Sequence, residues 1–405
     1  MCFFMQWLNV NPMSHSAQWY VILLASLFKW SKDEECYGKV RLQPLVYMDD
    51  TARASHNVST MRNGNIKLAS LMREKQLEIH PSKFGFLLYG SETFKAASRL
   101  EIKEEPVMLG KILMKEKLQE KYLGDILDSQ GLSESVEATI KTREPKIKGA
   151  IYELRALTED YRMQAVGGCQ SALDLFESCL IPSLLSNAGT WVEMTEKAVS
   201  MLDNIQDTFA RVLLALPVLA PRASLRAALG LLGGKWRVWE AKLHLVQAIR
   251  SQEEGGLARE VLEEQIYMGW PGLASEVSTI CKELKIPDAT VKDVDKTTIK
   301  KAIKYHHLTA LKEELTGDKL KDMANSDVSE RRAYTSWNVH ECRMAYRLET
   351  KMFICRANMP TMYKRDLTCR ACTLGLTREW TGRWRTRSTW RSARDMPASG
   401  QGWGQ

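Results

Sequence analysis

The chain has 405 residues, of which 44% are hydrophobic, so it is long enough to bury more than one apolar core. Its formal net charge of +8 is modest for that length, and seven of its nine cysteines stand too far apart for the disulfide framework of a small secreted domain. These properties exclude a disulfide-rich secreted scaffold and predict a globular intracellular protein, cytoplasmic or nuclear, with reduced thiols.

The first 36 residues contain one recognisable feature, the apolar run from Trp19 to Phe28. This run is shorter than the ~20 residues that a membrane-spanning helix needs. No Lys or Arg precedes it, as one would in a secretory signal peptide. We therefore interpret the run as buried core and expect no membrane partner. The rest of residues 1–36 is unassigned.

A strand pattern then leads into a pair of aspartates. Apolar residues recur from Val40 to Tyr47, and Asp49 and Asp50 follow directly. This arrangement predicts a strand, a tight turn and a returning strand.

A helix and a further strand are predicted next. Asn57 or Ser59 is expected to cap the helix. Its apolar face would consist of Met61, Ile66, Leu68 and Met72. A strand is predicted around Phe84–Tyr89, and the charged and mixed stretch 101–117 is expected to contain a subdomain joint.

From Ser133 onward the pattern is helical. Ser133 or Ser135 is expected to cap a helix that Pro145 breaks or kinks. Thr195 opens a second helix that stops at Pro217. The remaining predictions are a helix at 236–249, further charged helices over 252–326, and a disordered tail after Pro397.

Two adjacent carboxylates at a hairpin tip suit metal chemistry. Polymerases hold two Mg²⁺ ions about 3.5–4 Å apart, which clamp the attacking and leaving oxygens. Carboxylate oxygens are suitable ligands for this hard cation. The alternative is an ordinary solvated Asp-Asp pair in a surface turn.

The segment Tyr47-Met48-Asp49-Asp50 resembles the third palm motif of reverse transcriptases, and the downstream order resembles that of non-LTR (LINE-type) retrotransposons. That order is a helix at 58–72, then His80-Pro81-Ser82-Lys83, then Tyr122-Leu123-Gly124-Asp125. The resemblance implies an α+β fold, in which a partial polymerase palm of β-hairpin, helix and strand precedes a mainly α-helical thumb and C-terminal region. It also implies RNA-directed DNA synthesis on an RNA template and a DNA primer.

The resemblance assigns roles to particular residues. Asp49 and Asp50 would be catalytic Mg²⁺ ligands, and Lys83 would be the palm lysine, a candidate general acid for the leaving pyrophosphate. Tyr122, Leu123 and Gly124 would form the primer grip. Without the resemblance, Lys83 is a solvated charge and Tyr122-Leu123-Gly124 is an ordinary turn.

The resemblance extends over residues 37–372. Trp191, the segment 186–190 before it and the helix over 195–216 are similar to the family's thumb. The expected organisation is a leader (1–36) that is either unassigned or out of frame, a partial palm with the primer-grip-like turn (37–130), a thumb-like region (131–250), a helical C-terminal region (251–360) and a disordered basic tail (361–405).

The chain departs from the family pattern at both ends. A palm also needs an aspartate on a neighbouring strand, and upstream of Asp49 the acidic residues are Asp33, Glu34 and Glu35, which lie in a polar stretch. Residues 13–27 contain no glycine, although the second palm motif is Gly-rich. The fingers and first palm motif are therefore expected to be missing, and the chain to be inactive in isolation.

The C-terminal end lacks the rest of a zinc knuckle. Cys369 and Cys372 have the required spacing, but no His or Cys follows them. Since a closed zinc site needs four ligands, no zinc is predicted.

The basic tail suggests a second function. Arg383, Arg385, Arg387 and Arg391 lie among tryptophans and are expected to bind nucleic acid. The tail is alternatively the product of a shifted reading frame. Three hypotheses remain: a reverse-transcriptase fragment, a non-catalytic nucleic-acid-binding protein derived from a retroelement, and a decayed gene product.

Overall fold

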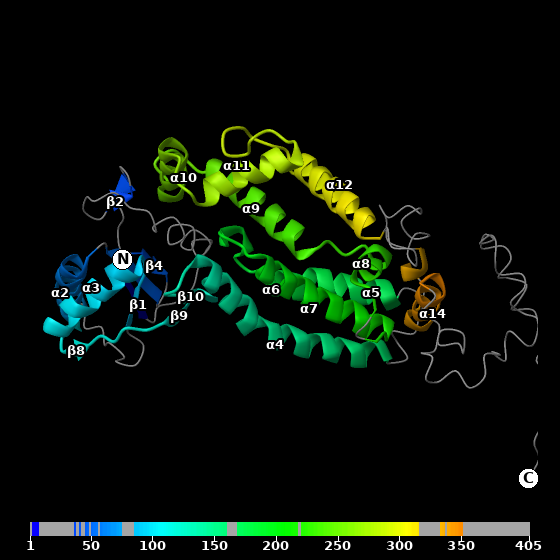
Figure 1. The fold of residues 1–405 in the computed structure, drawn as a ribbon, viewed down its shortest axis with the longest axis horizontal. Helices are drawn as coiled ribbons and strands as arrows, with labels where there is room; N and C mark the ends of the chain where they lie inside the picture. The colour runs from blue at the N-terminus through cyan, green and yellow to red at the C-terminus, as the bar shows by residue number, and fades with distance from the viewer. Residues whose placement is uncertain are drawn as a thin grey trace, which may run out of the picture. The chain divides into compact units, whose positions relative to one another are not determined.

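The computed structural model describes residues 2–7, 36–37, 40–41, 45–47, 50–55, 57–74, 85–159, 168–217, 220–315, 333–336 and 338–350 (Figure 1). The chain divides into two units, Met1–Tyr346 and Arg347–Gln405. Helix α14 (Val339–Glu349) runs into the second unit, of which only residues 347–350 are described. The run Trp19–Phe28, the cysteines Cys369 and Cys372, and the tail lie outside the described residues.

An antiparallel four-stranded sheet has the order β4-β5-β1-β6. Its strands are β1 (Cys2–Trp7), β4 (Leu45–Tyr47), β5 (Asp50–Ser55) and β6 (Gly85–Leu88). Strand β1 comes from the segment that the sequence left unassigned, yet it lies between β5 and β6. A separate short hairpin pairs β2 (Cys36–Tyr37) with β3 (Val40–Arg41).

A small core lies around β6. It contains α2 (Val58–Glu74), α3 (Glu92–Glu104) and the hairpin of β7 (Met108–Leu109) and β8 (Ile112–Leu113). The buried members of this core are Val58, Met61, Phe86, Leu88, Val107, Leu109 and Met114. Because Val107, Leu109 and Met114 share one core with α2 and β6, the expected subdomain joint over 101–117 is wrong.

The predicted helix cap is confirmed at Asn57, whose Oδ1 accepts from the Thr60 backbone N–H at 2.7 Å. The predicted apolar face of α2 is only partly right. Met61 is fully buried, but Ile66 is 68% exposed. Asn65 is buried in this region instead, and its side chain donates to the Met108 carbonyl at 3.0 Å.

A second hairpin, β9 (Gln119–Tyr122) with β10 (Asp125–Asp128), leads into the long helix α4 (Leu132–Glu159). Pro145 lies inside α4 without ending it, so the predicted break does not occur. Only the bond from residue 145 to the Lys141 carbonyl is lost, because proline has no N–H. Neither serine acts as the expected cap. Ser135 lies within the helix and donates to the Gly131 carbonyl at 2.6 Å.

Helices dominate the chain beyond α4. Thr195 caps α7 as predicted, since its hydroxyl accepts from the Ala198 N–H at 3.0 Å. The rings of Phe176 and Phe209 stack 3.8 Å apart within this region. The elements are α5 (Gly168–Leu175), η3 (Phe176–Leu180), α6 (Ile181–Leu184), η4 (Ala188–Thr190), α7 (Glu196–Leu214), α8 (Arg222–Leu229) and α9 (Gly234–Arg250).

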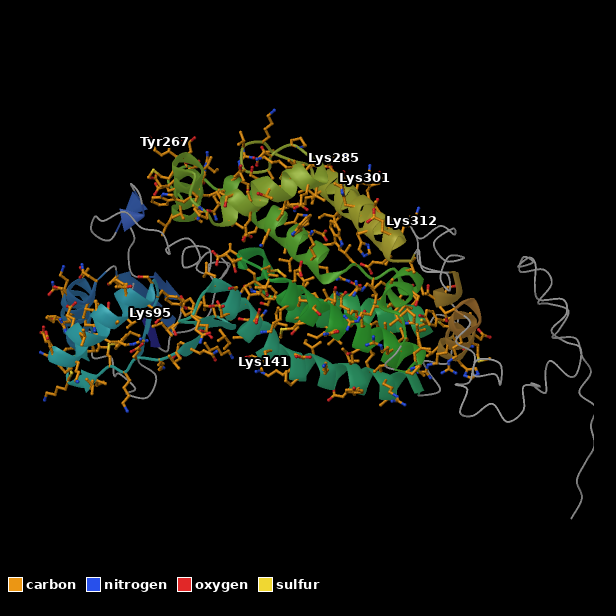
Figure 2. The ribbon with its side chains drawn as sticks, in the orientation of Figure 1. Lys95, Lys141, Tyr267, Lys285, Lys301 and Lys312 are labelled. Atoms are coloured by element: carbon orange, nitrogen blue, oxygen red, sulfur yellow. The ribbon has the colours of Figure 1, made fainter. Side chains whose placement is uncertain are left out.

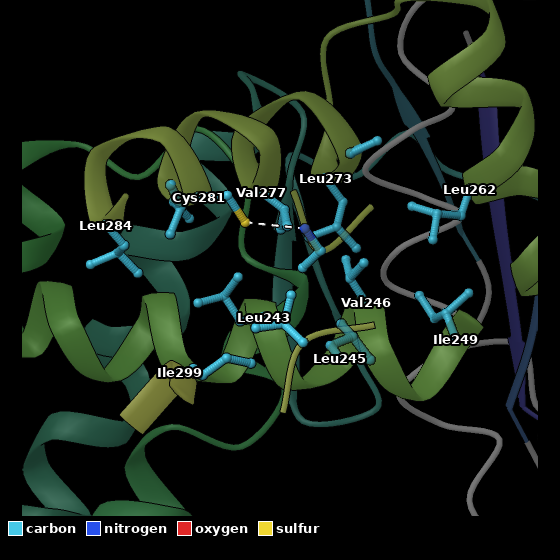
Figure 3. Packing of buried hydrophobic residues seen from close by; sticks show 14 of the residues in the cluster. Leu243, Leu245, Val246, Ile249, Leu262, Leu273, Val277, Cys281, Leu284 and Ile299 are labelled. Atoms are coloured by element: carbon cyan, nitrogen blue, oxygen red, sulfur yellow. Dashed lines mark hydrogen bonds between the residues drawn. The ribbon is translucent and has the colours of Figure 1, made fainter. Parts of the chain in front are cut away.

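A larger core joins α9 to α10 (Leu257–Met268), α11 (Leu273–Leu284) and α12 (Lys296–Glu314) (Figure 3). Its members include Leu243, Val246, Ile249, Leu262, Leu273, Val277, Cys281, Leu284, Ile299 and Ile303. Trp236 and Trp239 of α9 are partly buried and pack against this core. The Cys281 Sγ accepts from the Ala289 N–H at 3.3 Å.

The described chain ends with η5 (Ala333–Ser336) and α14. Two polar contacts connect α14 to earlier helices: the hydroxyls of Tyr346 and Ser224 lie 2.7 Å apart, and Arg343 Nε donates to the Leu213 carbonyl at 2.7 Å. None of the helices in the described ranges is long and apolar enough to cross a bilayer. At the coarse level the fold is α+β, mainly helical with small antiparallel sheets.

Candidate functional site

The aspartate pair lies where β4 turns into β5. Tyr47 pairs with Asp50 in an antiparallel register, so Met48 and Asp49 form the connection, and both lie outside the described residues. A two-residue connection is the commonest hairpin type. The pairing of a strand before the aspartates with a returning strand is thus confirmed for β4 and β5, whereas Val40 and Arg41 belong to the separate hairpin of β2 and β3. Asp50 is the first residue of β5.

The neighbouring strand brings no carboxylate to this hairpin. In the register of β1 with β5, Trp7 lies opposite Asp50 and Gln6 opposite Thr51. The sequence of β1, Cys-Phe-Phe-Met-Gln-Trp, contains neither Asp nor Glu. By the family resemblance, a two-Mg²⁺ site needs a further aspartate on the strand beside the aspartate pair. The residues that the described sheet offers therefore do not fit a two-metal site. Asp33, Glu34, Glu35 and Lys83 lie outside the described residues.

The Tyr122-Leu123-Gly124 segment forms a tight turn between β9 and β10. Tyr122 pairs with Asp125, which leaves Leu123 and Gly124 at the tip. Both have positive φ, 46° and 90° respectively, as a type I′ hairpin turn requires. Glycine adopts this conformation freely, but leucine does so rarely. Contacts elsewhere must therefore hold Leu123 in place.

Three polar side chains, Asp125, Arg143 and Asn187, provide those contacts, and we call them the turn clamp. Asn187 Nδ2 donates to the Leu123 carbonyl at 3.1 Å, and Arg143 Nη2 donates to the Gly124 carbonyl at 2.9 Å. Both carbonyls of the tip are thus satisfied by side chains from other elements. The Asp125 carboxylate accepts from Arg143 at 2.6 Å and from Asn187 at 3.1 Å.

Arg143 extends the clamp to the segment after α6. Its Nη1 donates to the carbonyls of Leu184 and Ser186, at 3.0 and 2.7 Å. Its guanidinium carbon lies 5.7 Å from the centre of the Trp191 ring, within cation–π range. One side chain on α4 therefore holds the hairpin, the 184–186 backbone and Trp191 together.

The clamp is a buried ion pair. The side chains of Asp125 and Arg143 are 4% and 13% exposed. Burial raises the pKa of the Asp125 carboxyl, while the charge of Arg143 and the hydrogen bond from Asn187 oppose that rise. Burial likewise lowers the pKa of Arg143, and Asp125 opposes this. Arg143 and Asn187 therefore stabilise the charged form of the Asp125 carboxyl, while the guanidinium remains protonated.

Sequence analysis singles out the two segments that meet at the turn clamp but does not predict their contact. Tyr122-Leu123-Gly124 and the 186–191 segment were separate expectations, and the structure brings them into contact across 64 residues through Asn187. Arg143 gave no signal, because it is one of five basic residues in a helix that also contains five acidic ones. The position of Asp125 directly after Leu123-Gly124 is the sequence feature that indicates its role.

Helix α12 presents a basic face that the sequence did not single out. Its buried stripe consists of Ile299, Ile303, His307 and Leu311. Its exposed lysines are Lys296, Lys300, Lys301, Lys304 and Lys312. We call Lys300, Lys301 and Lys304 with Tyr305 the α12 face. Tyr305 is 68% exposed, and Lys301 and Lys312 are labelled on the outer side of α12 in Figure 2.

Among the described residues, no acid forms an ion pair with the lysines of the α12 face. No Asp or Glu occurs from residue 296 to residue 312, and within the described part of the chain these lysines form no ion pair. Asp295 lies before the helix as its N-cap, and Glu313 and Glu314 end it. As far as the structure describes the chain, the middle of the helix therefore presents lysines without ion-pair partners beside the exposed ring of Tyr305.

Beneath this face, His307 is held as a neutral ring. It is 7% exposed, and its Nε2 accepts from the Gly233 N–H at 3.4 Å. Burial lowers its pKa to about 4, and the charges of Arg226 and Arg237 add to that effect. Protonation would remove the acceptor and place a cation in a buried site.

Comparison with known proteins does not identify the chain: no protein-family model, no curated protein and no solved structure matches it. Of the sequence-predicted site residues, Asp50, Tyr122, Leu123 and Gly124 belong to described hairpins. Asp49, Lys83, Arg383, Arg385, Arg387 and Arg391 lie outside the described residues.

Proposed function

We propose that this chain is related to the reverse transcriptases of LINE-type retrotransposons, with the Tyr47–Asp50 hairpin as part of a palm. The observation that carries the proposal is the register of Tyr47 with Asp50. It sets an aromatic residue and an aspartate on either side of a two-residue connection that contains the second aspartate. Aspartates are common in turns, but an ordinary Asp-Asp turn does not require the aromatic residue two positions before the pair that a third palm motif has.

The turn clamp supports the same proposal. A primer grip has to present backbone groups to the end of a nucleic-acid strand in a fixed position. At the Leu123–Gly124 tip, Asn187 and Arg143 bind both carbonyls and hold an unfavourable leucine conformation. Such rigidity at an exposed hairpin tip suits a positioning element. The proposed ligand is the 3′ end of a DNA primer paired with RNA.

We infer that the chain does not polymerise on its own. Asp50 faces a strand without a carboxylate, so the residues of the sheet cannot hold two Mg²⁺ ions. No chemical step is assigned to the hairpin for this reason. The proposed activity is binding of a primer–template end.

A photo-crosslinking experiment tests the primer-grip proposal. A photoreactive amino acid replaces Leu123 at the hairpin tip, or Leu100 on α3 as the exposed control, which is 65% exposed. Each protein is irradiated with a labelled DNA primer on an RNA template. We expect the Leu123 position to capture the primer near its 3′ end, and the Leu100 position to capture neither strand. Equal capture at both positions, or capture independent of the recessed end, would contradict the proposal.

Primer extension tests the inferred inactivity. Purified protein is incubated with the same RNA-templated primer, nucleotides and either Mg²⁺ or Mn²⁺. We expect no extension, with Asp50→Asn as the matched variant. Extension by the unchanged chain that disappears in Asp50→Asn would show an active polymerase and overturn the inference.

A second candidate function, non-catalytic nucleic-acid binding, is favoured by the α12 face. Lysines without acidic partners attract phosphates, and release of condensed counterions drives such binding. The exposed Tyr305 ring can stack on an unpaired base. This surface supports sequence-independent binding of single strands, and it needs no metal.

A further inference from the structure

Two cysteines far apart in the chain meet in the helical region. Cys169 lies on α5 and Cys342 on α14, and 173 positions separate them in sequence. Their sulfurs lie 3.1 Å apart, and both residues are fully buried. The other cysteines with described side chains lack such a partner: Cys281 accepts from a backbone N–H, and Cys179 is exposed beside Ser178.

The geometry of this pair is close to that of a disulfide. A disulfide needs its sulfurs about 2.05 Å apart, so these two have to approach by about 1 Å. A small side-chain rotation or a slight shift of α14 supplies such a movement. A thiol is only a weak hydrogen-bond donor and acceptor, so the reduced contact adds little stability by itself.

We propose that Cys169 and Cys342 are a redox-sensitive pair that forms a reversible disulfide between α5 and α14. This site is independent of the proposed primer–template binding. It would make the attachment of α14 to the helical region depend on the thiol–disulfide balance around the protein.

The oxidant is a small-molecule disulfide such as oxidised glutathione. One cysteine thiolate attacks it, which forms a protein–glutathione disulfide and releases one glutathione thiolate. The second cysteine then attacks the protein sulfur of that mixed disulfide and releases the second glutathione. Two protein thiols are oxidised, two glutathione thiols form, and the two protons pass to the released glutathiones.

Burial makes this pair a slow switch and protects it from accidental oxidation. The hydrogen bond with Cys169 and burial raise the pKa of the Cys342 thiol, so little thiolate exists in the closed state. Reaction therefore requires a transient opening of α14, whose described polar ties are Arg343 to Leu213 and Tyr346 to Ser224. Once formed, the bond closes a very long loop and restricts the unfolded chain.

Mass spectrometry of the full chain tests the proposal. Reduced protein is equilibrated at increasing ratios of oxidised to reduced glutathione, in buffer and in urea below the unfolding transition. Remaining thiols are then blocked with N-ethylmaleimide before digestion. We expect a cross-linked peptide that joins Cys169 to Cys342 and a rise of about 5 °C or more in the melting temperature.

Matched serine variants identify the bond. Cys281→Ser should keep both the cross-linked peptide and the temperature shift, whereas Cys169→Ser and Cys342→Ser should lose both. Recovery of Cys169 and Cys342 as blocked thiols at the most oxidising ratio, with and without urea, would overturn the proposal. Pairing of either cysteine with a different partner would overturn it equally, and the unchanged chain alone decides both outcomes.

Discussion

The guanidinium group of Arg143 connects segments that lie far apart in the sequence. Arg143 donates to three backbone carbonyls and to one carboxylate, at Gly124, Leu184, Ser186 and Asp125. Only arginine offers five donors in a planar fork, so no other side chain could make these bonds together. The position of the hairpin tip relative to the 184–186 backbone therefore depends on this residue.

Removal of Arg143 should destabilise the chain strongly. Arg143→Ala leaves the Asp125 carboxylate buried without its cation, which costs roughly 3–5 kcal/mol in the free energy of unfolding. The exposed Lys141 on the same helix is the matched control, and Lys141→Ala should change stability by less than about 0.5 kcal/mol. Urea unfolding measures both values. Equal stability of the two variants would show that the turn clamp does not contribute to the free energy of unfolding.

A second residue makes stability depend on pH. His307 has a folded pKa of about 4 against 6.5 when unfolded, so the folded state favours the neutral ring. Its contribution is fully present above pH 6.5 and is lost as the pH falls from 6.5 towards 4. The loss should reach about 3 kcal/mol at the lower end.

Urea unfolding between pH 7 and pH 4 checks this dependence, and variants separate it from the titration of carboxylates. His307→Gln keeps an acceptor for the Gly233 N–H but cannot titrate, so its stability should fall less steeply than that of the unchanged chain. His306→Gln, at the half-buried neighbour, should follow the unchanged chain. Identical curves for both variants would exclude His307 as the source.

At the scale of elements, α4 shows how tertiary packing overrides a local rule. The helix continues through Pro145 because its buried face, which includes Ile140, Ile147 and Ile151, is held on both sides of the proline. Helical stability in proteins comes largely from such packing. The missing hydrogen bond is a local cost that the packing exceeds.

Replacement of this proline should stabilise the chain. Pro145 is exposed, so Pro145→Ala removes no buried contact and restores an N–H that can donate to the Lys141 carbonyl. We expect a gain of roughly 1–3 kcal/mol in the free energy of unfolding, measured in urea. The neighbouring exposed Lys146→Ala serves as the control and should be nearly neutral. A loss of stability in Pro145→Ala would mean that the helix requires the proline's geometry.

Helix α12 combines a buried stripe with a basic surface, and the two can be changed separately. Replacement of Lys300, Lys301 and Lys304 by glutamine leaves Ile299 and Ile303 in place. If all three lysines contact phosphates, the log–log salt slope for single-stranded RNA should fall by about 2, since each contact contributes about 0.7. Affinity at low salt should fall with it.

A charge-matched variant controls for the loss of positive charge. Lys103, Lys111 and Lys115 are exposed and lie outside α12, and their replacement by glutamine removes the same net charge. Fluorescence anisotropy across a salt series compares the two triple variants, with circular dichroism as a check of folding. Equal salt slopes for the two triple variants would show that RNA binding depends on the net charge of the protein and not on the α12 face.

At the scale of the whole molecule, two basic regions are candidates for binding RNA, namely the segment after Thr361 and the α12 face. The residues after Thr361 contain Arg383, Arg385, Arg387 and Arg391 among tryptophans. A chain that ends at Thr361 should therefore bind single-stranded RNA with a flatter salt slope than the full chain. Combination with the α12 triple variant should flatten the slope further. An unchanged slope after truncation would assign the binding to the helices alone.

The local elements of this fold could be predicted because their causes are local. Asn57 and Thr195 cap helices through bonds to residues three positions away, and Leu-Gly at 123–124 marks a turn by its own conformational needs. The hairpin before Asp50 followed from neighbouring apolar residues. The two caps and the hairpin before Asp50 depend on neighbouring residues, whereas the Leu123 conformation also requires Arg143 and Asn187 from distant parts of the chain.

Interactions between distant segments could not be predicted in the same way. The pairing of β1 with β5, the meeting of Arg143 and Asn187 at one turn, and the contact of Cys169 with Cys342 each join residues that periodicity does not relate. The exposure of Ile66 and the intact helix at Pro145 were likewise decided by what packs nearby.

The sequence by itself determined the pairing of β4 with β5, the helices α2 and α7 with their caps at Asn57 and Thr195, the turn at Leu123–Gly124 and the aspartate pair with its family resemblance. Tertiary structure alone decided which strand lies beside Asp50, which side chains hold the Leu123–Gly124 tip and which lysines remain unpaired on α12. The physical reason is range: backbone propensity and capping act over a few residues, whereas burial, strand pairing and buried charge depend on segments brought together only by folding.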